Sequence, residues 1–137
     1  MVPNPGEYPT MCLIVYKSGK LAFFKDLKTL VATSLSNIEV ACWSARGKMA
    51  AAGNSSGEIL QLDVNGEVKA TIPAPQSFID DNGSIGFKEL NWVDNKVLVG
   101  IYCSKTEDPQ DTPATAVYSV TRITPVSRIF FHRSLIL

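Results

Sequence analysis

The sequence predicts an all-β fold built from short antiparallel strands, and two observations carry this prediction. Apolar and polar residues alternate with a period of two in short runs rich in β-branched and aromatic residues. Glycine-containing pairs separate these runs. The runs that we expect to be strands are CLIVY (12–16), KLAFF (20–24), IEVACW (38–43), EILQLDV (58–64), EVKATI (67–72), KVLVGIY (96–102) and TAVYSV (115–120).

The pairs between the runs predict tight hairpin turns. They are Ser18-Gly19, Arg46-Gly47, Ser56-Gly57 and Asn65-Gly66. Glycine supplies the positive φ that such turns need, so neighbouring strands are expected to be antiparallel. The segment DLKTLVATSL (26–35) is the best candidate for a helix, but its threonines and valine, and its position in the pattern, favour a strand.

A repeat runs through these strands. Residues 16–26 align with residues 54–64 at an offset of about 38, and residues 40–53 align with 89–101 at about 49, with Trp43 opposite Trp92 and one gap at the turn. The extra length falls in 74–86, which has the composition of an inserted surface loop. Four strands repeating every 40 to 50 residues are typical of a β-propeller blade.

The repeat divides the chain into expected parts. We expect an N-terminal segment at 1–10, a partial β-propeller at 11–122 and an atypical C-terminal tail at 123–137. The blades, WD40-like with four antiparallel strands each, are expected at about 11–35, 38–73 and 87–122. Strands of the blade at 38–73 are expected at 38–45, 48–53, 58–64 and 67–72. About two and a half to three blades are fewer than a closed ring contains, so the propeller is expected to be incomplete.

The two tryptophans are expected to pack between blades. Each one would end the first strand of its blade, where its ring can be buried while the indole nitrogen reaches a carbonyl. Stacking of either ring on a nucleobase is the alternative, but the surrounding sequence lacks the basic, aromatic-rich pattern of a nucleic-acid groove.

The sequence offers no catalytic constellation. His132 is the single histidine and has no acid or base partner near it, and Asp80-Asp81 is explained by loop solubility. No phosphate-binding glycine loop, zinc-ligand spacing or EF-hand pattern is present. The three cysteines are expected to be reduced, buried residues of an intracellular protein: Cys12, Cys42 and Cys103. We therefore expect no enzyme activity, no cofactor and no metal.

The charge balance and the absence of recognisable targeting signals limit the classes of partner that the sequence predicts. The chain has 13 basic and 13 acidic residues, so no overall field attracts nucleic acid or an anionic membrane. Its N-terminus lacks the blocks of a signal peptide, and no apolar run is long enough to cross a membrane. The glycosylation triplets at 54–56 and 82–84 are therefore discounted. Any binding is therefore expected to be local.

Residues 38–75, IEVACWSARGKMAAAGNSSGEILQLDVNGEVKATIPAP, resemble the N-terminal propeller of the cytoplasmic-face nucleoporin that docks the DEAD-box mRNA-export helicase. The features that carry the resemblance are the turn after Trp43, the glycine before the third strand, and the Ile72-Pro73 end of the fourth. The stretch ELNWVDNKVLVGIY (89–102) resembles the next blade of that family. The resemblance covers about residues 11–122, whereas the tail has no clear counterpart.

The resemblance implies a non-enzymatic docking scaffold at the cytoplasmic face of the nuclear pore complex that supports mRNA export. Its implied partners are the DEAD-box RNA helicase and other nuclear pore proteins. It implies no contact residue in this chain, and the inserted loops 74–86 and 104–113 are the candidates for partner contact. Since the family's propeller has about seven blades, we expect this chain to be a segment or a truncated product, and to self-associate or aggregate through uncovered blade faces. A WD-repeat-like scaffold of another intracellular assembly is the alternative.

Overall fold

The computed structural model describes residues 1–74 apart from 7, 9 and 27, together with 85–94, 97–104, 114–119 and 128–131. These residues form twelve strands in three four-stranded sheets, and every pair of neighbouring strands is antiparallel. No described residue is helical. The expected all-β fold of four-stranded antiparallel units is therefore confirmed.

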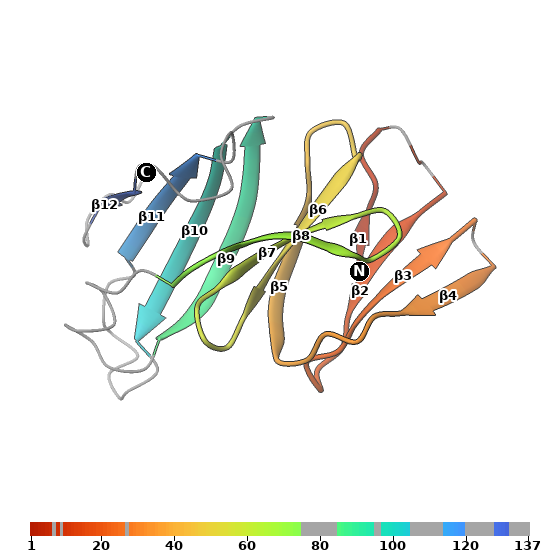
Figure 1. The fold of residues 1–137 in the computed structure, drawn as a ribbon, viewed down its shortest axis with the longest axis horizontal. Helices are drawn as coiled ribbons and strands as arrows, with labels where there is room; N and C mark the ends of the chain where they lie inside the picture. Colours follow the sequence, from red (N-terminus) through yellow and green to blue (C-terminus); the bar gives the residue numbers. More distant parts are fainter. Residues whose placement is uncertain are drawn as a thin grey trace.

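The strands follow one another in order within each sheet. The N-terminal sheet consists of β1 (Val2–Pro3), β2 (Cys12–Val15), β3 (Leu21–Lys25) and β4 (Thr29–Ala32). The middle sheet consists of β5 (Ile38–Trp43), β6 (Met49–Asn54), β7 (Ile59–Asp63) and β8 (Val68–Ile72). The C-terminal sheet consists of β9 (Ile85–Asp94), β10 (Val97–Ser104), β11 (Ala114–Ser119) and β12 (Arg128–Phe131). Figure 1 shows the three sheets in a row, with the middle sheet between the other two.

The hairpin turns have the backbone conformation that the sequence predicts. Each of the four glycines in the predicted turn pairs has a positive φ, between 73° and 91°. A residue with a Cβ is strained in this region, so these positions favour glycine. Asp26 and Asn37, two residue types that tolerate positive φ, occupy it elsewhere.

The repeat of about 38 residues is visible in the backbone hydrogen bonds. The Tyr16 amide donates to the Lys20 carbonyl at 2.9 Å in the first unit, and the Asn54 amide donates to the Glu58 carbonyl at 3.0 Å in the second. Inside the same turns, Gly19 and Gly57 donate to the carbonyls of Tyr16 and Asn54. The turn before β3 and the turn before β7 are therefore the same structure.

Two strands lie outside the ranges expected for the blades. β1 lies in the segment 1–10 and pairs with β2 through Val2 opposite Leu13, while β12 lies in the segment 123–137 and pairs with β11. β1 is only two residues long and contains Pro3, so it has no period that sequence analysis could detect. Its partner strand, not its own sequence, defines it. The segment 26–35 contains the strand β4, as its composition favours.

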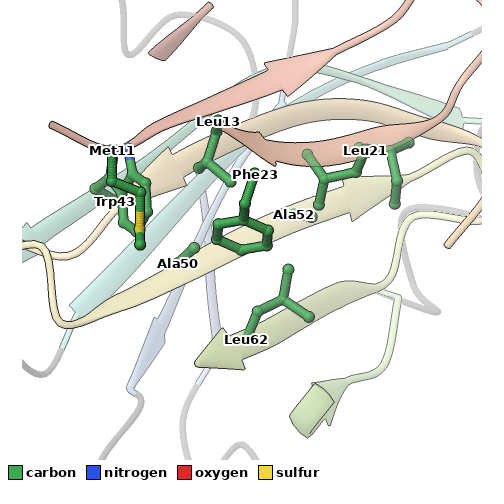
Figure 2. Packing of buried hydrophobic residues seen from close by; sticks show 9 residues of the cluster. Met11, Leu13, Leu21, Phe23, Trp43, Ala50, Ala52 and Leu62 are labelled. Atoms are coloured by element: carbon green, nitrogen blue, oxygen red, sulfur yellow. The ribbon is translucent and has the colours of Figure 1, made fainter. Parts of the chain in front are cut away.

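The middle sheet is covered on both faces. Ala50 and Ala52 of β6 face the N-terminal sheet, while Ala51 belongs to the cluster that faces the C-terminal sheet, and all three are fully buried. A strand covered on both faces is expected to be continuously apolar instead of alternating. The run MAAAG is therefore explained by its position between two sheets, where small side chains allow close approach. Figure 2 shows Ala50 and Ala52 on either side of the ring of Phe23.

Candidate functional site

Two seams of buried apolar side chains join the adjacent sheets of the described structure. The first seam joins the N-terminal and middle sheets through a cluster of buried side chains: Met11, Leu13, Leu21, Phe23, Ile38, Trp43, Ala50, Ala52 and Leu62. At its centre, the rings of Phe23 and Trp43 meet edge to face, with centroids 5.8 Å apart and an interplanar angle of 72°. This arrangement is favourable for aromatic rings beyond the area they bury.

Trp43 is 6% exposed, which confirms its predicted packing between blades. Its indole Nε1–H donates to the backbone carbonyl of Val2 at 2.9 Å. The same ring therefore fills the seam and holds β1 in place. A buried indole that is paired in this way is structural and presents no face for stacking on a base.

Asn4 forms a second tie across the first seam. Its side chain is buried, and its Nδ2 donates to the Gly47 carbonyl at 2.8 Å. Its Oδ1 accepts hydrogen bonds from the amides of Gly6 at 2.9 Å and Tyr8 at 3.3 Å. A Cβ on Gly47 would overlap the Asn4 side chain. Gly47 is therefore required both for its positive φ and for the space that Asn4 occupies.

The second seam joins the middle and C-terminal sheets. Its buried cluster consists of Ala51, Ile59, Ile72, Phe87, Leu90, Leu98 and Tyr102. The rings of Phe87 and Tyr102 lie 4.5 Å apart at 38°, and the Tyr102 hydroxyl donates to the Gly57 carbonyl at 3.1 Å. This bond spans 45 residues of sequence and fixes β10 against the turn between β6 and β7.

Glu39 holds the start of β9. Its Oε1 accepts a hydrogen bond from the Phe87 amide at 2.9 Å, although the two residues are 48 positions apart. Phe87 follows the inserted segment, so the carboxylate of Glu39 fixes the point at which the chain returns from that insertion to the sheet. A charged acceptor makes a stronger bond than a neutral one.

The loops expected to contact partners, 74–86 and 104–113, fall mainly on residues 75–84 and 105–113, which lie outside the described residues. Their described ends belong to strands or adjoin them. β9 begins at Ile85, β10 ends at Ser104, and β11 begins at Ala114. Both connections therefore depart from sheets that the seams hold in place.

Trp92 occupies the position in the C-terminal sheet that Trp43 occupies in the middle sheet. Trp92 pairs with Leu98 and packs against the second seam, just as Trp43 pairs with Ala50 and packs in the first. The match of the two tryptophans is therefore confirmed. The Trp92 ring is only partly buried, and its Nε1, which is buried, has no hydrogen-bond partner among the described residues.

The two described cysteines differ in burial: Cys12 is buried and Cys42 is partly buried. Burial raises the pKa of the Cys42 thiol from 9.0 to about 12, against a smaller opposing effect of the Trp92 backbone. Cys12 is 8% exposed. Both are free thiols. A thiol with a raised pKa is a poor nucleophile near neutral pH, so Cys42 is not suited to covalent catalysis.

Neither a metal-binding cluster nor a membrane-spanning helix is found among the described residues. No group of three or more His, Cys, Asp or Glu side chains in the described ranges could hold a metal ion. Among those ranges there is also no helix long and apolar enough to cross a membrane. The residues weighed above for chemistry, His132, Cys103, Asp80 and Asp81, lie outside the residues whose side chains are described.

Comparison with known proteins decides the family. The family model described as the NUP159/214 beta propeller matches residues 1–135 of the chain. The chain belongs to the NUP159/214 β-propeller family. Its three sheets are therefore blades, and three blades make an incomplete propeller because closed propellers contain four or more.

A curated relative agrees with this assignment. Nucleoporin NUP159 of Chaetomium thermophilum is 31% identical over 130 residues, which cover 89% of this chain and 8% of the relative. The chain thus spans less than a tenth of the length of that NUP159. The NUP159/214 match favours a nucleoporin scaffold over a WD-repeat-like scaffold of another assembly.

Two solved structures share the fold with little sequence identity. BamB from Moraxella catarrhalis superposes with a TM-score of 0.57 at 18% identity, covering 90% of this chain and 34% of BamB. Apo AztD from Citrobacter koseri gives the same TM-score at 16% identity, covering 85% of this chain and 30% of AztD. At this level of identity the likeness concerns the fold alone.

The family match is wider than the expected range of 11–122. It includes the first ten residues and most of the tail, up to residue 135, for which the sequence analysis found no counterpart. The structure gives a physical reason, because β1 and β12 lie in these two segments and complete the first and third sheets.

The residues that tie the blades together at long range were missed by sequence analysis. Asn4, Glu39 and Val2 act through partners more than 40 positions away. Only Asn4 carries a local signal, since an Asn-Pro-Gly sequence is typical of a turn in which the side chain binds the following backbone.

Proposed function

We propose that the chain acts as part of a non-enzymatic docking scaffold at the cytoplasmic face of the nuclear pore complex and supports mRNA export there. The observation that carries the proposal is the NUP159/214 match over residues 1–135. The proposed partners are the DEAD-box mRNA-export helicase and other nuclear pore proteins. The scaffold itself turns over no substrate.

The arrangement of the blades supports a docking role. The blades are joined by two apolar seams and by hydrogen bonds from Asn4, Glu39 and Tyr102, which hold the described sheets against one another. The two longest connections, 74–86 and 104–113, leave this framework at the ends of β8, β9, β10 and β11. Loops on a rigid scaffold are the usual location of binding residues. We therefore propose these connections as the surface that a partner contacts.

Three blades do not form a complete ring, and this sets the expected affinity. We expect this chain to bind the helicase weakly or not at all. A partner that contacts several blades of a closed ring would find only part of its binding surface on three blades. A longer chain that continues to a closed ring is expected to bind, and the binding is expected to weaken with salt if complementary charge steers docking.

The test is a pull-down of the purified helicase with this chain and with the longer chain, each at low and high salt. The variant Trp43→Ala of the longer chain, in which the first seam is disrupted, is the control for a scaffold that has lost its fold. Binding by the longer chain alone, weaker at high salt, is the expected result. If the longer chain does not bind the helicase at either salt concentration, the proposal that the helicase is a partner is contradicted.

A further inference from the structure

We propose that the start of β9 is held against the middle sheet by a side-chain latch that has two arrangements. In the first arrangement, which the structure contains, Glu39 binds the Phe87 amide and Tyr102 binds the Gly57 carbonyl. In the second arrangement, the Phe87 amide binds the Gly57 carbonyl directly. The proposal concerns how two sheets meet, and it does not depend on the helicase or on the nuclear pore.

Two β-bulges identify equivalent positions at the starts of β5 and β9. The register of β5 with β6 skips Glu39, and the register of β9 with β10 skips Lys88. These two positions are 49 residues apart, which is also the separation of the two tryptophans. Ile38 and Phe87, which precede the two bulges, are therefore equivalent residues.

Each bulge turns the residue before it into a seam. Strict alternation along β9 would place Phe87 and Leu90 on opposite faces, but the bulge between them places both in the second seam. In β5 the bulge likewise places Ile38 and Ala41 together at the first seam. The Phe87 ring lies directly on Gly53, where a Cβ would be 2.6 Å from a ring carbon. The two strands therefore start in the same way.

The two starts differ in the hydrogen bonds to the preceding sheet. At the first seam, the Ile38 amide donates to the Gly19 carbonyl at 2.8 Å. Gly57 is the counterpart of Gly19 in the repeat of 38 residues, but its carbonyl accepts a hydrogen bond from the Tyr102 hydroxyl at 3.1 Å. A side chain thus binds the carbonyl that a backbone amide binds in the first seam.

The Phe87 amide, the counterpart of the Ile38 amide, is also bound by a side chain. It donates to Oε1 of Glu39 at 2.9 Å. Tyr102 lies opposite Phe87 in the ladder, and the two rings are 4.5 Å apart, so the hydroxyl and the amide approach the middle sheet from one pair of residues. When the hydroxyl and the carboxylate are both removed, the Gly57 carbonyl can accept the Phe87 amide as Gly19 accepts the Ile38 amide.

Hydrogen exchange of the folded chain, resolved to single amides, tests the proposal. The variants are Glu39→Ala, Glu39→Gln, Tyr102→Phe and the double variant Glu39→Ala/Tyr102→Phe. Tyr16→Phe removes a hydroxyl from a tyrosine that is 40% exposed and serves as the matched control. The Ile38 amide, which is bound in the first seam, is the internal reference in every sample.

The Phe87 amide is expected to exchange at least about tenfold faster in Glu39→Ala, because it loses a charged acceptor. Glu39→Gln keeps a side-chain oxygen as acceptor, so a smaller increase is expected. In the double variant the Phe87 amide is expected to exchange more slowly than in Glu39→Ala, since the Gly57 carbonyl becomes its acceptor. The Ile38 amide and the Tyr16→Phe control are expected to exchange as in the wild type.

Two results would overturn the proposal. Unchanged exchange of the Phe87 amide in Glu39→Ala would show that the carboxylate does not hold β9. Exchange in the double variant that is as fast as in Glu39→Ala, with the Ile38 amide still protected, would show that the second arrangement does not form. If Glu39→Ala also exposes the Ile38 amide, Glu39→Gln and Glu39→Gln/Tyr102→Phe provide the same comparison in a folded chain.

Discussion

The indole of Trp43 donates its Nε1–H to the backbone carbonyl of Val2, 2.9 Å away and 41 positions earlier in the chain. The bond couples the last residue of β5 to β1, the shortest strand of the described structure. Trp43 therefore has two roles: its ring fills the first seam against Phe23, and its nitrogen fixes the strand that completes the N-terminal sheet.

Removal of the Trp43 ring is expected to be strongly destabilising. Trp43→Ala should lower the free energy of unfolding by about 3–5 kcal/mol, because it leaves a cavity in a seam and frees the Val2 carbonyl. Trp43→Phe keeps an aromatic ring but loses the donor, so we expect a smaller loss of roughly 1–2 kcal/mol. Urea denaturation measures both values. A change within about 0.5 kcal/mol for Trp43→Ala would show that the ring is not part of the core.

Two glycines with similar backbone conformation separate the effects of φ and of space. Gly66→Ala should lower the free energy of unfolding by about 1–2 kcal/mol, because its φ of 86° is strained for a residue with a Cβ. The new Cβ would lie 3.2 Å from the Thr33 methyl carbon, so only a small shift of that side chain is needed. Gly47→Ala should cost more, since its Cβ also displaces the Asn4 side chain from its hydrogen bonds. Thermal or urea unfolding of both variants tests this order. Equal losses of stability in the two variants would show that Asn4 does not stabilise the turn at Gly47.

The Cys42 thiol predicts a dependence of stability on alkaline pH. Its pKa is about 12 in the folded chain and near 9.0 when burial is lost. Between these two values the unfolded chain loses the thiol proton and the folded chain retains it, so the contribution of Cys42 to stability is complete below pH 9 and falls as pH rises toward 12. Cys42→Ala removes this contribution.

The measurement is the difference in unfolding free energy between wild type and Cys42→Ala, followed from neutral to alkaline pH. Other groups titrate in the same range, but they are present in both proteins and largely cancel. Above pH 9, the free energy of unfolding of the wild type is expected to fall relative to that of Cys42→Ala. Slow reaction of Cys42 with a thiol reagent at pH 8, and fast reaction after unfolding, provides an independent readout. A fully reactive Cys42 in the folded chain would show that the thiol is not buried.

The sequence predicts those parts of the fold that local chemistry determines. Gly19, Gly47, Gly57 and Gly66 mark turns because a positive φ favours a residue without a Cβ. The equivalent positions of Trp43 and Trp92 follow from a repeat that can be read by alignment. The strands expected at 38–45, 48–53, 58–64 and 67–72 lie within two residues of β5 to β8.

What the sequence does not predict depends on partners far along the chain. β1 is a strand because Val2 lies opposite Leu13, and two residues give no period to detect. The hydrogen bond of Glu39 with the Phe87 amide joins two segments that only the stacking of blades brings together. The candidate partner loops could be located by their composition, but their contacts depend on a surface that the described residues do not include.

Hydrogen exchange of the backbone amides tests most directly the claim that the middle sheet is a blade covered on both faces. Strand β6 is bonded on both sides and lies between two seams, whereas β4 and β8 are outer strands with mostly exposed side chains. The amides of Ala50, Ala51 and Ala52 are therefore expected to be among the slowest to exchange, and those of β4 and β8 faster. If β6 exchanges as fast as β4 and β8 in the folded chain, the stacked arrangement of the three blades is contradicted.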